Sequence, residues 1–239
     1  MGAQWKQKGR EAAANAKGKV MTKLVKEITV AARAGADPTM NSRLRMAVDA
    51  AKKASMAKDT LERAIKKGAG LLDGGSAQFD TVFYEGFAPH QVPVIVECLT
   101  ENKNRTASNI RVHFNKGHGQ LASAGAVSWD FARLGAVDGN APSGKTVDPE
   151  EEAIEAGAQE LDPPDEEGTV TFYTDPTELD AVGKRLAERG WTLTSSRLIW
   201  KAKNPVKVDD AAKRSEVEAF LSAVDGDDDV HAVYVGLAG

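Results

Sequence analysis

Cysteine and long apolar runs are almost absent from this chain of 239 residues. The single cysteine, Cys98, rules out a disulfide framework, and no stretch approaches the ~18 consecutive apolar residues of a membrane helix. The segment before Val20 is basic but lacks the apolar core of a secretory signal. These absences predict a cytoplasmic protein with no membrane partner. Asn104-Arg105-Thr106 spells a glycosylation acceptor, which matters only in secreted chains, so glycosylation is not expected.

Motifs that would indicate an enzyme or a metal site are also missing. Neither the dinucleotide-binding nor the P-loop glycine spacing occurs, and no nucleophile–base set or carboxylate pair stands out. His113 and His118 are separated by a glycine and do not share a helical face. Three aspartates mimic a calcium loop without the Glu at its twelfth position: Asp225, Asp227 and Asp229. We therefore expect no catalytic residue, metal, cofactor or small-molecule substrate, and Cys98 is expected to be a buried, inert thiol. An unrecognised enzyme or a protein-interaction scaffold is the remote alternative.

Charge is distributed unevenly along the chain. Residues 1–76 contain 16 Lys or Arg and 7 Asp or Glu, a net charge of +9, whereas residues 77–239 contain 15 and 28, a net charge of −13. A basic segment joined to an acidic remainder suggests an oriented polyanion binder, because only the basic part is attracted to phosphates. A well-solvated basic helical surface with no nucleic-acid partner is the equally open alternative.

Apolar spacing predicts helices in the basic segment. Residues 1–19 are rich in Lys, Ala and Gly and are expected to form a flexible basic arm. From Val20 the apolar residues recur with a helical period, and Gly35 is expected to end that helix. Two further helices are expected, one carrying Leu44 and Val48 on its apolar face and one over residues 58–67. Residues 20–77 are therefore predicted to form a small helical bundle.

Strands and helices alternate from residue 78 onward. TVFYEGF and VPVIVECL predict a β-hairpin, followed by a helix over residues 105–116 with Asn104 as its N-cap. Further strands are predicted for AVSWDFARLGAV, TVTFYT, WTLTSSRLIWKA and VHAVYVGLA. Helices are predicted for PEEEAIEAGAQEL and for residues 178–188 and 209–224. The fold class is therefore expected to be α+β and multi-domain.

Three long stretches belong together: GKVMTKLVKEITVAARAGADPTMNSRLRMAVDAAKKASMAKDTLERAIKKGAG, YEGFAP and VIVECLTENKNRTASNIRVHFNKGHGQL. They closely resemble the YebC/PmpR family, whose bacterial members are commonly classed as probable transcriptional regulators. The mitochondrial relative is a translational activator of cytochrome c oxidase. The resemblance implies an N-terminal three-helix bundle followed by two small α/β (ferredoxin-like) domains, the third inserted in the second. The middle domain is then expected over residues 78–132 plus 206–239, and the inserted domain over 133–205.

Two segments depart from the family pattern. The family usually opens with His-Ser-Lys-Trp, whereas this chain has MGAQWKQKGREAAANAKGK. The usual Asn-Met-Pro-Lys-Asp loop appears here as Ser55-Met56-Ala57-Lys58-Asp59, and loss of the proline leaves the loop less rigid. These departures predict a divergent subgroup whose target differs from that of better-known members.

The charge pattern and the resemblance together predict a non-enzymatic nucleic-acid-binding regulator of gene expression. The family label favours a DNA-binding transcriptional regulator, and a factor that binds ribosomal RNA or the ribosome and regulates translation is the alternative. Phosphate contacts are expected from basic residues of the arm and helices: Lys6, Lys8, Arg10, Lys19, Lys23, Lys26, Arg33, Arg43, Arg45, Lys58, Arg63, Lys66 and Lys67. The alternative for each of these residues is an ordinary solvated side chain on a helix surface, with no contact to phosphate. Further contacts with a partner are expected from two loops: Met56, Asp59, Asn102, Asn104 and Arg105.

Overall fold

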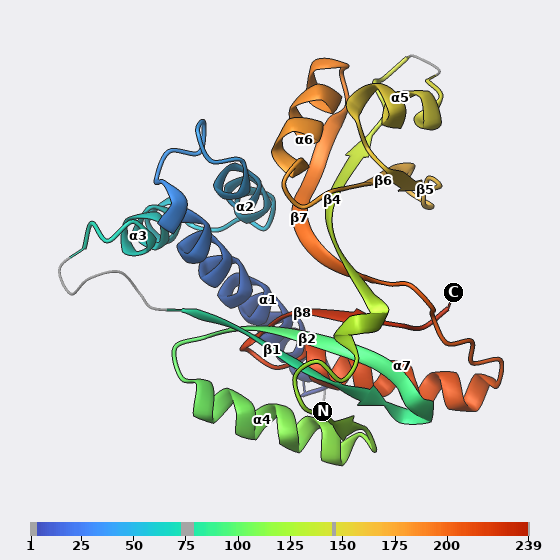
Figure 1. Cartoon of the computed structure of the whole chain (residues 1–239). Coiled ribbons are helices and arrows are strands. Elements are labelled where there is room, and N and C mark those ends of the chain that lie inside the picture. The colour runs from blue at the N-terminus through green and yellow to red at the C-terminus, as the bar shows by residue number, and fades with distance from the viewer. Residues whose placement is uncertain (1–3, 73–78, 145–146, 239) are drawn as a thin grey trace. The chain divides into compact units, whose positions relative to one another are not determined.

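The computed structural model describes residues 4–72, 79–144 and 147–238, with side chains from Gly18 onward except Ser42. The chain forms two compact units, the first from residues 1–128 and 205–239 and the second from residues 129–204. Seven α-helices and two antiparallel sheets occur in the described residues, which confirms the prediction of an α+β chain (Figure 1).

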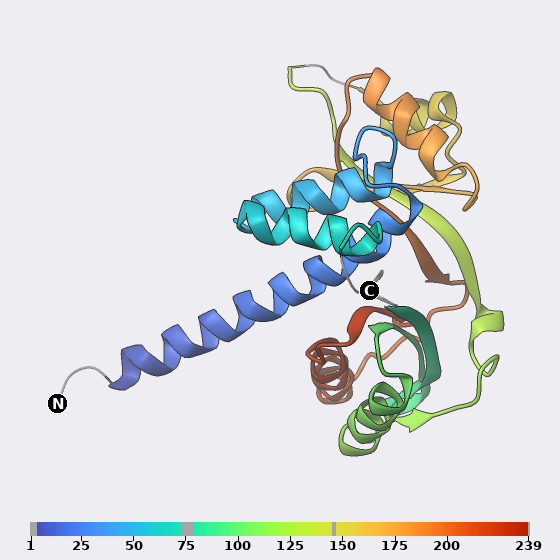
Figure 2. The same ribbon diagram turned by 90° about the vertical axis from the view of Figure 1, so that its left-hand side faces the viewer.

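Three helices begin the first unit: α1 (Gln4–Ala31), α2 (Ser42–Lys53) and α3 (Lys58–Gly68), with a short 3-10 turn over Ala32–Ala34. Figure 2 shows α2 and α3 beside the C-terminal part of α1. Ile28, Leu44 and Ala64 lie in their shared core. At the crossing of α1 and α3, a Cβ on Gly68 would lie 2.2 Å from the Thr29 carbonyl oxygen, so only glycine permits this approach.

The beginning of α1 differs from the sequence prediction. Residues 4–19, expected to be a flexible arm, belong to the same continuous helix as the following residues. The stretch from Glu11 to Lys17 is rich in alanine, the residue with the highest helix propensity, which accounts for the extension.

The first unit also contains a four-stranded sheet in the order β3-β1-β2-β8. Its strands are β1 (Asp80–Ala88), β2 (Val92–Thr100), β3 (Gln120–Leu121) and β8 (Val230–Val235). β1 and β2 form the predicted antiparallel hairpin, joined by a 3-10 turn over Pro89–Gln91. Two helices, α4 (Lys103–Lys116) and α7 (Ala211–Asp225), lie on the same side of the sheet in Figure 1.

The core beneath these helices is apolar and tightly packed. Phe114 of α4 meets Phe220 of α7 edge to face, with ring centroids 5.0 Å apart. Cys98 of β2 lies in the same core, and burial raises the pKa of its thiol to about 12. The expectation of a buried thiol at this position is therefore confirmed, and the high pKa keeps it in the unreactive thiol form.

Glu85 of β1 fixes the segment through which the chain leaves the first unit. Its buried carboxylate accepts hydrogen bonds from the backbone N–H groups of Gly125, Val127 and Ser128 at 2.8–2.9 Å. Burial alone would raise the pKa of Glu85, but these three donors outweigh it and hold the pKa below its usual value.

The second unit contains another four-stranded antiparallel sheet, in the order β5-β6-β4-β7. Its strands are β4 (Phe131–Asn140), β5 (Glu160–Asp162), β6 (Thr169–Thr174) and β7 (Thr192–Ala202), and its helices are α5 (Pro149–Ala156) and α6 (Leu179–Glu188). A 3-10 turn over Ser128–Asp130 precedes β4. The core contains Val137, Phe172 and Trp191. No helix in the described residues is long and apolar enough to cross a membrane.

Candidate nucleic-acid interface

Three lysines of α1 bind acceptors of their own chain rather than facing solvent freely. Lys19, Lys23 and Lys26, which we call the lysine row, recur at i, i+4 and i+7 and so share one side of the helix. Lys19 Nζ donates to the Gly226 carbonyl oxygen at 2.7 Å. Lys23 Nζ donates to the carbonyl oxygen of Asp225 at 2.8 Å and to its carboxylate at 2.9 Å. The row therefore meets the C-terminal end of α7, where exposed carbonyls and the helix dipole attract cations.

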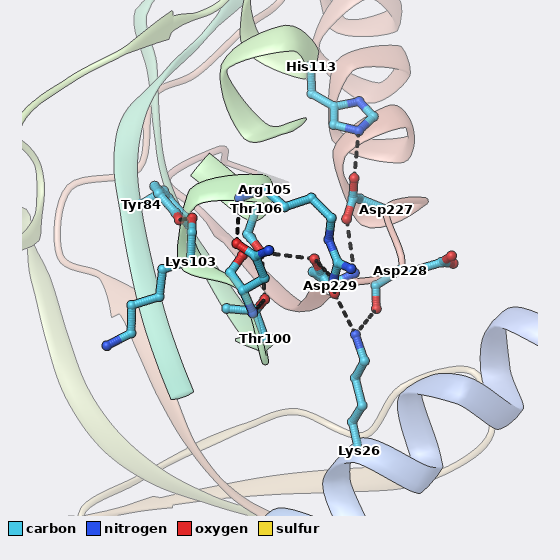
Figure 3. Close-up of polar contacts among 11 residues, drawn as sticks. Lys26, Tyr84, Thr100, Lys103, Arg105, Thr106, His113, Asp227, Asp228 and Asp229 are labelled. Carbon is cyan, nitrogen blue, oxygen red and sulfur yellow. Dashed lines mark hydrogen bonds and ion pairs between the residues drawn. The ribbon is translucent and has the colours of Figure 1, made fainter. Parts of the chain in front are cut away.

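Lys26 belongs to a polar group around a buried carboxylate that we call the Asp229 cluster: Lys26, Arg105, Thr106 and Asp229 (Figure 3). The Asp229 side chain is only 4% exposed. It accepts from Lys26 Nζ at 2.7 Å, from Thr106 Oγ1 at 2.8 Å and, at both carboxylate oxygens, from Arg105 Nη2 at 3.0 and 2.9 Å. Burial would raise the pKa of Asp229, but these donors outweigh it and lower the pKa.

The start of α4 supplies two members of this cluster. Asn102 is the N-cap residue, and its side-chain oxygen accepts from the Arg105 N–H at 3.1 Å. The sequence prediction placed the cap at Asn104, which is wrong because the helix begins at Lys103 and Asn104 is already helical. A second polar contact fixes the turn, since the Asn102 N–H donates to Thr100 Oγ1 at 2.9 Å. The anion near this helix start is therefore the chain's own Asp229.

Other basic residues predicted to touch phosphate also have partners within the first unit. Arg43 Nε lies 2.8 Å from Glu27 Oε1, and His231 Nε2 lies 3.1 Å from Glu27 Oε2. Arg33 Nη1 donates to the Phe79 carbonyl oxygen at 2.8 Å. Lys67 Nζ lies 3.4 Å from Glu101 and 5.7 Å from the centroid of the Phe79 ring.

A second group of basic residues remains exposed, and we call it the outer basic set: Arg45, Lys58, Arg63 and Lys66. Arg45, Arg63 and Lys66 have no ion pair with any residue that the structure describes. Lys58 has one weak pair, 3.7 Å from Glu62, and its side chain is 85% exposed. On α3 the inward positions are Leu61, Ala64 and Gly68, so Arg63 and Lys66 point outward.

The remaining predicted contacts fall in different places. Met56 is partly buried and packs against the core shared by α1, α2 and α3. Asp59 is exposed in the first turn of α3. The side chains of Lys6, Lys8 and Arg10 lie outside the described residues. Lys53, exposed at the end of α2, shares the character of the outer basic set but was not predicted as a contact.

Sequence reasoning did not identify the roles of Asp229 and Glu27. Asp229 was interpreted as part of an acidic turn that merely imitates a calcium loop. The available signal was charge complementarity, since a row of lysines on one helix face can pair with carboxylates of the acidic remainder of the chain. The contact nevertheless joins residues 203 positions apart, a separation that local periodicity does not reach.

Comparisons with known proteins agree with this architecture. Residues 2–71 match the model of the TACO1/YebC protein N-terminal domain, and residues 79–237 match that of the TACO1/YebC second and third domain. A "Probable transcriptional regulatory protein" of Pseudomonas syringae pv. syringae is 59% identical over all of both chains. A protein of that description from Bdellovibrio bacteriovorus is 49% identical, over 98% of this chain and 99% of its own.

A solved structure supports the fold as well. The crystal structure of a conserved hypothetical protein from Aquifex aeolicus superimposes with a TM-score of 0.81 at 40% identity. It covers 92% of this chain, and 90% of that chain is matched. The fold of most of this chain is therefore the fold of that solved structure. The chain belongs to the TACO1/YebC family.

Proposed function

We propose that this protein is a non-enzymatic regulator of gene expression that binds nucleic acid through the outer basic set. The observation that carries the proposal is the contrast in pairing: Arg45, Arg63 and Lys66 are exposed without described acidic partners. Unpaired cations on helices are suited to phosphate contacts, since binding phosphate then breaks no internal bond and releases counterions. The relatives' shared description as transcriptional regulatory proteins agrees with this role.

The target that fits the relatives' description is duplex DNA. Ribosomal RNA is the second candidate, because the composition of α3 gives no sign of adenine readout in a DNA duplex. The helix sequence KDTLERAIKKG contains no Asn or Gln, and its outward positions include Asp59 beside Arg63 and Lys66. Side chains that commonly read adenine are thus missing from this helix, whereas backbone phosphates of either nucleic acid need only the cations.

A finer fold assignment accompanies the proposal. The second unit has the element order β4-α5-β5-β6-α6-β7, which is the β-α-β-β-α-β order of a ferredoxin-like domain. In the first unit, α1–α3 would form the three-helix bundle, and the sheet with α4 and α7 the middle domain. A cytoplasmic location and independence from cofactors and small-molecule substrates are part of the same proposal.

The direct test is a charge-reversal variant, Arg45→Glu with Arg63→Glu and Lys66→Glu. Its affinity for a fluorescent DNA duplex and for single-stranded RNA should fall about a hundredfold at low salt. The salt slope should shrink by roughly 0.9 for each duplex phosphate that the variant no longer neutralises. The matched control reverses three exposed basic residues of α4 and α7: Arg111, Lys116 and Lys213. An equal fall in affinity in both variants would contradict a role for α2 and α3.

Sedimentation with ribosomes distinguishes the two targets. If RNA is the target, the wild-type protein co-sediments in a salt-sensitive way that excess duplex DNA does not abolish. If duplex DNA is the target, that competitor removes the protein from the ribosome fraction. Binding to neither polyanion would overturn the proposed function.

A further inference from the structure

The lysine row is held with unequal strength along its length. At the inner end, Lys26 and Asp229 are 13% and 4% exposed, and Arg105 and Thr106 also bind the same carboxylate. At the outer end, Lys23 and Asp225 are 24% and 60% exposed. Lys19 is exposed, and its bond among the described residues is to the carbonyl oxygen of Gly226. Exposed ion pairs contribute little stability, whereas breaking a buried pair leaves an uncompensated charge. The outer contacts are therefore the exchangeable ones.

We propose that Lys19 and Lys23 form a second phosphate-binding surface for the same polyanion, and that Asp225 with the last carbonyls of α7 occupies it as an internal competitor. The inference rests on the proposed function, because it concerns how the same nucleic acid gains access to Lys19 and Lys23. In this conformation the Asp225 carboxylate sits on Lys23 where a phosphate oxygen would sit. A bound nucleic acid displaces Asp225, while Lys26 stays on Asp229 and keeps α1 attached to the sheet.

Geometry and chemistry both support an exchange of this kind. Lys19 and Lys23 are four residues apart, about 6 Å along the helix, so both flexible side chains can reach one stretch of phosphate backbone. A carboxylate and a phosphate offer the ammonium group the same type of acceptor oxygen. The negative end of α7 adds to the competition, because phosphate must approach Lys19 past the Gly226 carbonyl.

The test uses the variant Asp225→Asn in the full chain, because it keeps the size of the side chain and removes its charge. Without its competitor, Lys23 should bind phosphate more readily, raising the affinity for the fluorescent duplex or the RNA about two- to fivefold at low salt. The salt slope should steepen by up to roughly 0.9 for duplex DNA. The matched control is Asp209→Asn, which removes an equally charged group from an exposed pair, Lys207 to Asp209 at 2.9 Å.

A double-mutant cycle then assigns the gain to Lys23. In the Lys23→Gln background, Asp225→Asn should raise the affinity no more than Asp209→Asn does. Thermal unfolding of each variant shows whether α1 remains packed. Equal gains for Asp225→Asn and Asp209→Asn in the wild-type background would overturn the inference, since the effect would then be one of net charge alone.

Failure of the inference is distinguishable from failure of the proposed function. If the wild-type protein binds and the charge reversals on α2 and α3 weaken binding, but Asp225→Asn matches its control, only the internal competitor is refuted. If the wild-type protein and Asp225→Asn both fail to bind duplex DNA and RNA, the proposed function falls and this inference falls with it.

Discussion

The lysine row on α1 and the outer basic set on α2 and α3 look alike in the sequence but differ in structure. Both lie in the basic segment and both were predicted to contact phosphate. The row is bonded to the end of α7 and to Asp229, whereas Arg45, Arg63 and Lys66 have no ion pair among the described residues. A basic residue in the sequence is therefore weak evidence for a nucleic-acid contact until the structure shows whether an acidic group or a carbonyl of the same chain already binds it. Lys26 fastens α1 to Asp229. Lys19 and Lys23 must release acceptors of α7 before they can bind a ligand, whereas the outer set needs no such exchange.

The largest effect that tests this comparison is expected from Asp229→Asn. Removing the buried charge leaves the largely buried ammonium group of Lys26 without its counter-ion, which should lower the free energy of unfolding by about 3 kcal/mol. Chemical denaturation measured by circular dichroism gives this value directly.

Two controls complete that measurement. The exposed pair variant Asp209→Asn and the outer-set variant Arg63→Gln should each change the unfolding free energy by less than about 0.5 kcal/mol. If Arg63→Gln destabilised the protein as much as Asp229→Asn, the outer basic set would be structural and the comparison would fail.

Acidic pH should also lower the free energy of unfolding through the carboxylates that have internal partners, but by less than the substitution of Asp229 does. Asp229, Glu27 and Glu85 all have a pKa lowered in the folded state, by donors that outweigh burial. The unfolded chain then binds protons first as the pH falls, so their stabilisation is complete near pH 7 and declines below about pH 4.5. At pH values above the pKa of Asp229 in the folded protein, this carboxylate stays ionised and keeps part of its stabilising effect. Acidification in that range should therefore lower the free energy of unfolding less than Asp229→Asn does.

The measurement is the free energy of unfolding between pH 7 and pH 3. Asp229→Asn should give a shallower decline than the wild type, because one of the titrating carboxylates is gone. A variant with Arg45, Arg63 and Lys66 changed to Gln should reproduce the wild-type profile. An unchanged slope in Asp229→Asn would mean that this carboxylate does not contribute to the acid response.

Local features of the fold could be predicted from the sequence. Helical periodicity predicted α2 and α3, and β-branched runs around a short turn predicted the hairpin of β1 and β2, because neighbouring residues determine both patterns. The extent of α1 was missed, since Lys and Gly around the alanines suggested an arm. The Asp229 cluster could not be predicted, because its ion pairs join residues more than 120 positions apart and depend on how helices pack on the sheet.

The smallest effect is expected at the start of α4, and it concerns how the lysine row keeps its inner partner. Asn102→Ala removes the side-chain acceptor of the Arg105 N–H and should lower the unfolding free energy by about 1 kcal/mol. Asn104→Ala, at the exposed position where the sequence predicted the cap, should change it by less than about 0.5 kcal/mol. Because the cap positions Arg105 and Thr106 on Asp229, combining Asn102→Ala with Asp229→Asn should cost less than the sum of the two single changes. Strict additivity would show that the cap and the Asp229 cluster act independently, and the contact between α4 and the lysine row would then be incidental to the attachment of α1.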